Sequence, residues 1–323
     1  MKEPGGVRTG STPSVSVVIP AYNVAPYIAE TLNSVFAQTF TDFEVIVVDD
    51  GSPDGEELER ALGAYRERVR YVRQENLGAG AARNRGIRES RGELIAFLDS
   101  DDVWMPKYLE KQVRFLREGG HDLAYADALL FGDSPIAGKT YMQTAPSVGP
   151  VTFLSLVRNK SNILTSGVVA RRSILIEVGL FNETLRNGQD FELWARLAKH
   201  GARLAYQRKV LLRYRCREGS LSGDAMNRIA REMRVYRYIA DNYDLTEAER
   251  AELSRTMHLQ RGAVDLTTGK LNLLDGQFDE ARSSFERAHE VLGGWKLRAA
   301  VLMLRVAPRL LRRLALSRLR TAF

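Results

Sequence analysis

The 323-residue chain contains a single cysteine, Cys216, and four histidines scattered along its length. One cysteine cannot form an internal disulfide, so the chain is not a disulfide-stabilised scaffold, and we expect a reducing compartment. Histidines that do not cluster predict no zinc site, because zinc sites need three or four close ligands.

The chain also lacks a long hydrophobic run. No segment approaches the roughly 18 apolar residues of a membrane-spanning helix, so no transmembrane helix is predicted. Residues 1–13 are polar, with no apolar centre like that of a signal peptide, and we expect them to be disordered. These expectations place the protein in the cytoplasm.

Positive charge is concentrated at one end of the chain. The formal net charge is +7, yet residues 294–323 carry eight Lys or Arg and no acidic residue, which leaves −1 on the remainder. Cations among Leu, Val and Ala are typical of an amphipathic segment on an anionic membrane surface. The alternative is a helix that closes a neighbouring hairpin and leaves its basic face in water. No nucleic-acid partner is implied, because the body of the chain is not basic.

Short β-branched runs alternate with helical patterns over roughly the first 128 residues. Strands are predicted at 15–19, 45–48, 69–73 and 94–98, and helices at 26–38, 55–65 and 80–90, with a further helix begun by Pro106. Residues 131–150 are predicted to be a loop, followed by strands at 168–170 and 211–215 and a helix at 190–200. Repeated β-then-α units favour a mostly parallel, doubly wound sheet.

From about residue 224 the pattern is helical to the end. Residues 269–288 resemble one tetratricopeptide-like helical hairpin, and Pro308 is expected to split the basic tail into two helices. A single repeat cannot bury its own apolar face. We therefore expect it to pack on the helix at 226–242, on the tail or on a partner.

The most informative motif is Asp99-Ser100-Asp101, directly after the strand predicted at 94–98. Open α/β sheets bind ligands at the carboxyl ends of their strands. Two carboxylates in this spacing can hold Mg²⁺ or Mn²⁺ and leave coordination positions open for a diphosphate. Asp is common in turns, so this triplet alone is weak evidence for a metal site. The polar residues at the other strand ends make the interpretation stronger.

Polar groups follow the other three strands as well. The first strand leads to Tyr22, whose ring can lie under a nucleobase, and the second ends in Asp49 and Asp50, which can bind a nucleoside or hold a turn. The third leads to a glycine-rich turn and Arg83, which occupies the third glycine position of a dinucleotide fingerprint and so excludes that motif. Together these strand ends predict a nucleotide crevice.

Four segments in this order resemble the family 2 inverting glycosyltransferases of GT-A fold. They are residues 15–23, 47–52, 80–86 and 97–102, and the resemblance covers about residues 14–222. It implies a GT-A fold, doubly wound and mostly parallel, to which the sequence adds a C-terminal all-helical extension. It also implies the donor-binding residues, which match Pro20, Tyr22, Asp50, Arg83, Asp99 and Ser100.

Within that set, the resemblance implies that Tyr22 stacks on the base, Asp50 reads its edge and Arg83 lines the pocket. Asp101, with Asp99, would hold Mn²⁺ or Mg²⁺ on the diphosphate. A metal there stabilises the charge that develops as the glycosidic bond breaks.

The acceptor side departs from the family pattern. Family members often carry Glu-Asp at the start of a late helix, and here Gln189 replaces the Glu while Asp190 takes the position of the catalytic base. The resemblance places Gln189 and Trp194 on the acceptor side. An Asp at a helix start is also an ordinary N-cap. Arg217 stands where the family often has His, and we expect it to bind the donor diphosphate unless it is a surface loop arginine.

The resulting hypothesis is a metal-dependent inverting glycosyltransferase. It would move a sugar from a nucleotide-diphosphate donor, a UDP-sugar by family frequency, to a hydroxyl of a saccharide or lipid-linked acceptor in cell-envelope or exopolysaccharide synthesis. We expect it in the cytoplasm, peripheral at the inner membrane face. The expected regions are 1–13, a GT-A domain at 14–222, a helical region at 223–293 and a basic amphipathic tail at 294–323.

Two other functions fit the sequence less well. A non-catalytic nucleotide-sugar-binding module with a partner-recruiting tail is less favoured, because Asp101 and Asp190 are both present. A sugar nucleotidyltransferase would need a glycine-rich basic loop after the first strand, and residues 21–25 offer none.

Overall fold

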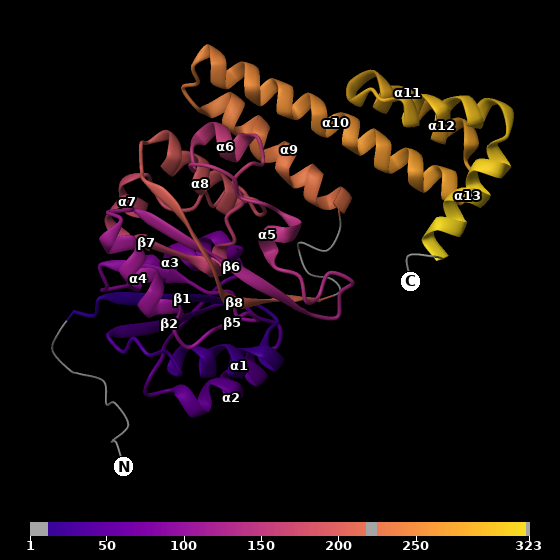
Figure 1. Cartoon of the computed structure of the whole chain (residues 1–323). Coiled ribbons are helices and arrows are strands. Elements are labelled where there is room, and N and C mark those ends of the chain that lie inside the picture. Colours follow the sequence, from indigo (N-terminus) through magenta and orange to yellow (C-terminus); the bar gives the residue numbers. More distant parts are fainter. Residues whose placement is uncertain (1–11, 218–224, 321–323) are drawn as a thin grey trace. The chain divides into compact units, whose positions relative to one another are not determined.

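The computed structural model describes residues 12–217 and 225–320, and the chain divides after residue 223 into two compact units. The first unit contains one eight-stranded sheet with helices on both faces (Figure 1). The described residues of the second unit form helices joined by short connections, with no strand among them.

The first half of the sheet is parallel. Its strands are β1 (Val15–Ala21), β2 (Phe43–Asp50), β3 (Arg70–Gln74) and β4 (Leu94–Phe97), in the spatial order β3-β2-β1-β4. The chain builds outward from β1 to β3 and then returns to place β4 on the other side of β1. This reversal is the topological switch point at which open α/β sheets bind ligands.

The second half of the sheet is mixed. It contains β7 (Val168–Arg171), β6 (Leu123–Gly132), β8 (Leu204–Cys216) and the short edge strand β5 (Val103–Trp104). β6 and β8 pair in parallel, whereas β7 runs antiparallel to both β4 and β6. The mostly parallel, doubly wound sheet is confirmed. β8 begins earlier than predicted, because polar residues interrupt the apolar pattern of its first half.

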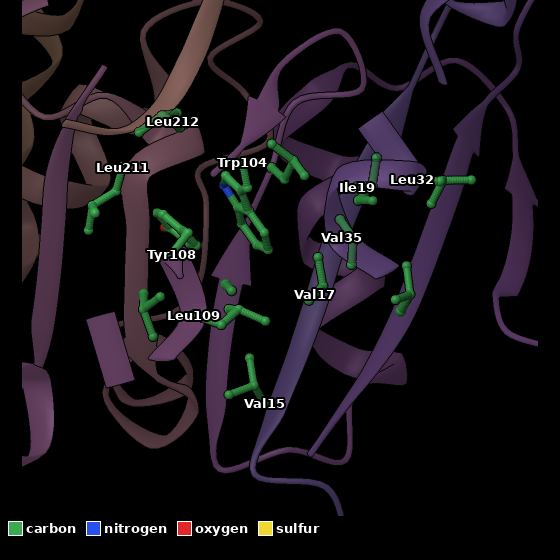
Figure 2. Close-up of a cluster of buried hydrophobic side chains, with 14 of the residues drawn as sticks. Val15, Val17, Ile19, Leu32, Val35, Trp104, Tyr108, Leu109, Leu211 and Leu212 are labelled. Atoms are coloured by element: carbon green, nitrogen blue, oxygen red, sulfur yellow. The ribbon is translucent and has the colours of Figure 1, made fainter. Parts of the chain in front are cut away.

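Helices cover both faces of the sheet. One face carries α1 (Ala25–Phe36), α2 (Gly55–Leu62) and α4 (Tyr108–Glu118), and the other carries α3 (Ala79–Glu89), α6 (Phe153–Val157), α7 (Arg172–Glu177) and α8 (Gln189–Lys199). Side chains of β1 alternate between the two cores, as the pleat requires. Val15, Val17 and Ile19 enter the first core, seen in Figure 2, and Val18 enters the second.

Shorter elements connect this framework. They are the 3₁₀ turns at Gly63–Tyr65 and Thr165–Gly167 and the one-turn helix α5 (Tyr141–Thr144). The helix α5 lies within the segment predicted as a loop, and its Thr140–Gln143 capping box explains why one turn forms there. The prediction that Pro106 begins α4 was wrong, because α4 starts at Tyr108.

The second unit contains α9 (Ala225–Asn242), α10 (Glu247–Asp275), α11 (Phe278–Leu292), α12 (Trp295–Val306) and α13 (Pro308–Arg320). The predicted hairpin is formed by α10 and α11. They pack closely at Gly269, where an added Cβ would lie 2.5 Å from Phe285 Cδ1. Pro308 is the first residue of α13, so the predicted division of the tail is confirmed.

The tail shares the core of the hairpin. A single cluster joins residues of α10 to α13: Leu273, Ala281, Phe285, Val301 and Leu304, with Leu297, Ala300, Leu311 and Ala315 packed against it. The alternative interpretation, a tail that closes the hairpin, therefore holds for the inner faces of α12 and α13. No helix within residues 12–217 and 225–320 is long and apolar enough to cross a membrane.

Candidate active site

The end of β1 is tied to the turn after β2. Pro20 pairs in register with Val48, and Tyr22, just beyond the strand, is 48% exposed. Asn23 has a positive φ of 54°, and its N–H donates to Ser52 Oγ at 2.6 Å. The ring of Tyr22 is thus presented at the carboxyl edge of the sheet, where a planar ligand can stack on it.

Asp49 holds the turn after β2. The residue is fully buried, and its carboxylate accepts from Ser52 N at 2.8 Å and from the Tyr71 hydroxyl at 2.6 Å. Of the two adjacent aspartates, Asp49 therefore has the structural role that a turn requires.

Asp50 fixes the loop that leads into α3. Its Oδ1 accepts from Gln74 Nε2 (2.8 Å) and Leu77 N (3.0 Å), and its Oδ2 accepts from Gly78 N (2.8 Å). Only 3% of the residue is exposed. A carboxylate has about four acceptor positions. Asp50 thus retains capacity for one further donor, such as a base N–H.

Arg83 lies beside the D-x-D on the buried face of α3. Its Nη2 is 2.6 Å from Asp99 Oδ1, and its guanidinium carbon lies 5.6 Å from the centre of the Phe181 ring. The residue is 6% exposed, and its Nε has no hydrogen-bond partner. A buried cation with an unused donor therefore lies next to Asp99.

The loop that carries the D-x-D is anchored to α1. The Thr31 hydroxyl lies 2.9 Å from the carbonyl oxygens of both Ser100 and Asp102. Ser100 is 5% exposed, so its hydroxyl is not presented to solvent.

Three carboxylates crowd this loop. Asp102 is fully buried, its Oδ1 accepts from Arg215 N at 2.8 Å, and its Oδ2 has no partner. Burial, followed by the charges of Asp101 and Asp99, raises the pKa of Asp102 well above its usual value. Burial and the charge of Asp99 also raise the pKa of Asp101, against the opposing charges of Arg217 and Arg215. This excess of negative charge favours a cation.

Arg215, near the end of β8, and Arg217, just after β8, lie against Asp101. Arg217 Nε is 3.0 Å from Asp101 Oδ2, an ion pair in which the N–H does not point at the oxygen. Arg215 Nε donates to Asp101 O at 2.8 Å, and both guanidinium groups lie about 5 Å from the Tyr27 ring centre, at 4.9 and 5.1 Å. Arg215 and Tyr27 were not among the residues predicted for the site from the sequence. The signal for Arg215 was its spacing of two from Arg217, because an extended chain carries residues i and i+2 on one side.

Asp190 is joined to the D-x-D through the 3₁₀ turn Thr165–Gly167. Thr165 Oγ1 donates to Asp190 Oδ2 at 3.2 Å, and Asp99 N donates to Ser166 Oγ at 3.1 Å. Asp190 is half-buried in the first turn of α8, where its Oδ1 also accepts from Phe191 N at 2.8 Å. The N-cap of α8 is Gly188 rather than Asp190. Thr165 and Ser166 carried no motif that would have predicted this role.

Two residues expected on the acceptor side are buried. Gln189 is 6% exposed and packs on the start of α3, where a Cβ added to Gly80 would lie 3.0 Å from Gln189 Cγ. Trp194 is 1% exposed and packs on Phe97 and Phe181, with ring centres 6.3 and 6.0 Å away. Trp194 belongs to the core and presents no surface to an acceptor, so that expectation was wrong.

No cluster of three or more His, Cys, Asp or Glu in residues 12–217 and 225–320 is arranged to hold a metal ion. A divalent cation at the D-x-D would therefore have few protein ligands. That donor set suits Mg²⁺ or Mn²⁺, which take the remaining oxygens from water and substrate phosphates. The unpartnered Oδ2 of buried Asp102 and the crowded carboxylates fit a nearby cation.

The sequence matches the family described as Glycosyl transferase family 2 over residues 16–179, which is half of the chain. The chain belongs to glycosyltransferase family 2. Among its relatives in this family, TuaG of Bacillus subtilis is named for teichuronic acid biosynthesis. It is 30% identical over 233 residues, which cover 72% of this chain and 90% of TuaG.

An uncharacterized glycosyltransferase of Rickettsia felis is 34% identical over 217 residues, covering 63% of this chain. The matched region spans about a third of the length of that relative, at 34%.

Two solved structures share the fold. S. aureus TarS 1–349 in complex with UDP-GlcNAc has a TM-score of 0.62 and 25% identity, covering 95% of this chain and 91% of that one. The mannosyltransferase PcManGT of Pyrobaculum calidifontis, in complex with GDP-Man and Mn²⁺, has a TM-score of 0.63 at 18% identity, covering 94% and 84%. These likenesses confirm the GT-A fold of this chain.

Proposed function

We propose that the protein transfers a sugar from a nucleotide-diphosphate donor to an acceptor hydroxyl with inversion at the anomeric carbon. One observation carries the proposal. The consecutive residues Thr165 and Ser166 bond to Asp190 and to the backbone of Asp99, so one rigid turn connects the candidate base to the candidate diphosphate site. Transfer needs both groups within reach of the same anomeric carbon.

The donor site that we propose lies along the carboxyl ends of β1, β2 and β4. Tyr22 would stack on the base, Asp50 would accept from the base edge, and Arg83 would face the nucleotide. Pro20 and Ser100 would contribute through the backbone that shapes this edge. A UDP-sugar is the favoured donor, because the structural neighbour TarS is solved with UDP-GlcNAc.

Asp101 and Asp99 are the residues that would hold Mn²⁺ or Mg²⁺ with the donor bound. When bound, the metal would supply charge stabilisation to the leaving diphosphate. Arg217, already at Asp101, would add a guanidinium able to bind two phosphate oxygens.

Asp190 would act as the general base. Its carboxylate accepts one hydrogen bond on each oxygen, which leaves lone pairs for an acceptor hydroxyl. As that hydroxyl attacks the anomeric carbon, its proton passes to Asp190 and the sugar–diphosphate bond breaks. Thr165 keeps the carboxylate oriented during this step.

The acceptor that we propose is a saccharide or a lipid-linked saccharide in cell-envelope polysaccharide synthesis. This setting is supported by the relative named for teichuronic acid biosynthesis, of which the chain covers 90%.

A ligand screen tests the proposed function. The protein is incubated with UDP- and GDP-sugars, with and without Mn²⁺, and its melting temperature is recorded. A donor at 100 times its Kd adds about 2.7 kcal/mol to the free energy of unfolding. Release of UDP in the presence of an acceptor would support transfer. Stabilisation without turnover on any saccharide or lipid-linked acceptor would favour the non-catalytic module, and no stabilisation by any nucleotide sugar would refute the donor site.

A further inference from the structure

Helix α12 is apolar on two opposite faces. Its inner face, with Val301 and Leu304, packs in the core of the helical unit. Its outer face carries a second apolar stripe: Trp295, Ala299, Leu302 and Val306. These residues are spaced by four, three and four positions, which places them on one side of an α-helix. Trp295, Leu302 and Val306 are 76%, 53% and 85% exposed.

The next helix repeats this arrangement. The inner face of α13, with Leu311 and Ala315, joins the same core, whereas Leu310 and Leu314 are 51% and 48% exposed. Several large apolar side chains exposed at helical spacing on each of two consecutive helices are unusual in a monomeric protein and mark a surface with a partner.

Cations border the exposed stripe. Arg298 lies to one side of it on α12 and Lys296 to the other, and Arg309 and Arg313 lie beside the exposed leucines of α13. Among the side chains that the structure describes, none of these four has an acidic partner. By contrast, Arg305 pairs with Glu286 at 2.7 Å and serves the fold.

We propose that the outer faces of α12 and α13 bind the surface of an anionic lipid bilayer. The apolar stripe would enter the boundary between headgroups and acyl chains, where the amphipathic ring of Trp295 is favoured. The bordering cations would contact lipid phosphates, each contributing about 1 kcal/mol. No described helix can span the bilayer, so both helices would lie in the plane of its surface.

The distribution of charge favours lipid over a second copy of this chain. Residues 294–323 hold eight cations and no acidic residue, and the remainder of the chain carries only −1. An isologous contact would place the same unpaired arginines against one another, which repel. An anionic bilayer supplies the missing charge along the whole length of both helices. The surface belongs to the helical unit and does not rest on the donor site.

The natural probe of this surface is Trp295. The chain has three tryptophans, and Trp104 and Trp194 are only 2% and 1% exposed, so the fluorescence of Trp295 alone reports contact with solvent. We expect the full-length protein to sediment with vesicles of phosphatidylglycerol and phosphatidylcholine at low salt. Emission should shift to shorter wavelength, and acrylamide quenching should fall. Vesicles of phosphatidylcholine alone should bind much less, and high salt should weaken binding in part, because salt screens the charges only.

Deleting the tail would expose the hairpin core and so disturb folding. Substitutions at exposed positions instead test vesicle binding while leaving the core intact. Leu302→Gln with Val306→Gln should weaken vesicle binding at least about tenfold, because two apolar side chains no longer enter the lipid. Leu259→Gln with Leu271→Gln, exposed leucines of α10 at 42% and 50%, is the matched control and should bind like wild type.

Charge is tested in the same way. Arg309→Gln with Arg313→Gln should weaken binding to anionic vesicles, and Arg261→Gln with Lys270→Gln on α10 should not. Circular dichroism and melting temperature establish that each variant is folded. The proposal is overturned if wild type does not bind anionic vesicles at low salt, or if folded stripe and control variants bind alike. It is also overturned if sedimentation shows a dimer that only the stripe variant dissociates.

Discussion

Arg217 Nε lies 3.0 Å from Oδ2 of Asp101, the carboxylate that we propose as a metal ligand. Arg217 occupies the position where the resemblance to family 2 leads us to expect a histidine. A histidine can ligate a metal, whereas the permanently charged guanidinium of Arg217 cannot. When a donor and a divalent metal ion bind, the Asp101 carboxylate would coordinate the metal instead of pairing with Arg217. The guanidinium, which lies on the Tyr27 ring, would then be available to the diphosphate.

The first prediction concerns this arginine. Arg217→Ala should weaken UDP binding about tenfold or more while changing uridine binding little, because charge-assisted bonds to phosphate are lost and base contacts remain. Titration calorimetry with both ligands measures the difference. Arg208→Ala removes an exposed cation of β8, the strand that ends just before Arg217, and should leave both affinities unchanged. Equal weakening of UDP and uridine binding would show that Arg217 does not contact phosphate.

A second prediction concerns metal dependence. Wild type should bind UDP more tightly with Mn²⁺ than without it, and Asp101→Asn should remove most of that gain, because a neutral amide is a poor ligand for a hard cation. Calorimetry with and without Mn²⁺ provides the comparison. Asp133→Asn, an exposed aspartate after β6, is the control and should keep the full gain. A metal effect that persists in Asp101→Asn would place the cation elsewhere.

The framework of the site could be predicted from the sequence. β1, β2 and β4 are β-branched or apolar runs that end abruptly in polar residues, so strand and strand end were visible together. Their order in the sheet then brings Tyr22, Asp50 and Asp99 to one edge, as expected.

The partners that hold the site could not be predicted in this way. Thr165 and Ser166 reach Asp190 and Asp99 only through contacts between segments 25 and 67 residues apart. Trp194 was misplaced because the sequence does not reveal which face of α8 packs on Phe97. The tail has apolar residues on both faces of α12, so its composition could not show that one face is core and the other exposed.

A third prediction tests pH dependence in the fold. Glu44, at the start of β2, accepts from Arg91 N and Ser16 Oγ, both at 2.7 Å. Burial alone would raise the pKa of Glu44, but hydrogen bonds from Arg91 and Ser16 and the charge of Arg91 outweigh burial and lower it. A lowered pKa means that the ionised form stabilises the fold above the unfolded value of about 4.3 and that this stabilisation is lost as pH falls through the folded pKa.

Glu44→Gln should therefore lower the free energy of unfolding by about 1–3 kcal/mol at pH 7, and this difference should shrink as the pH falls below about 4. Urea unfolding of wild type and variant at pH 7 and below pH 4 measures this difference in the free energy of unfolding. Glu56→Gln, an exposed acid of α2, should have little effect at either pH. If Glu44→Gln lowers the free energy of unfolding equally at both pH values, the loss is due to changed packing or hydrogen-bond geometry rather than to the lost charge.

The last prediction concerns Asp190. Asp190→Asn keeps an oxygen that can accept from Thr165 or Phe191 but cannot take a proton from the acceptor. We expect kcat to fall by about 10²–10⁴, the usual contribution of a general base, while the Kd for the donor stays within about threefold of wild type.

The rival interpretation is that Asp190 only stabilises the first turn of α8, since its Oδ1 accepts from Phe191 N. Glu247→Gln supplies the comparison, because it neutralises an acid in the first turn of α10, outside the sheet-bearing unit. If Asp190 were only structural, the two variants would lower the melting temperature alike and both would retain transfer. A large loss of kcat in Asp190→Asn alone, at an unchanged melting temperature, identifies Asp190 as the base. Thr165→Val should then give a smaller loss, because it frees the carboxylate to rotate without removing it.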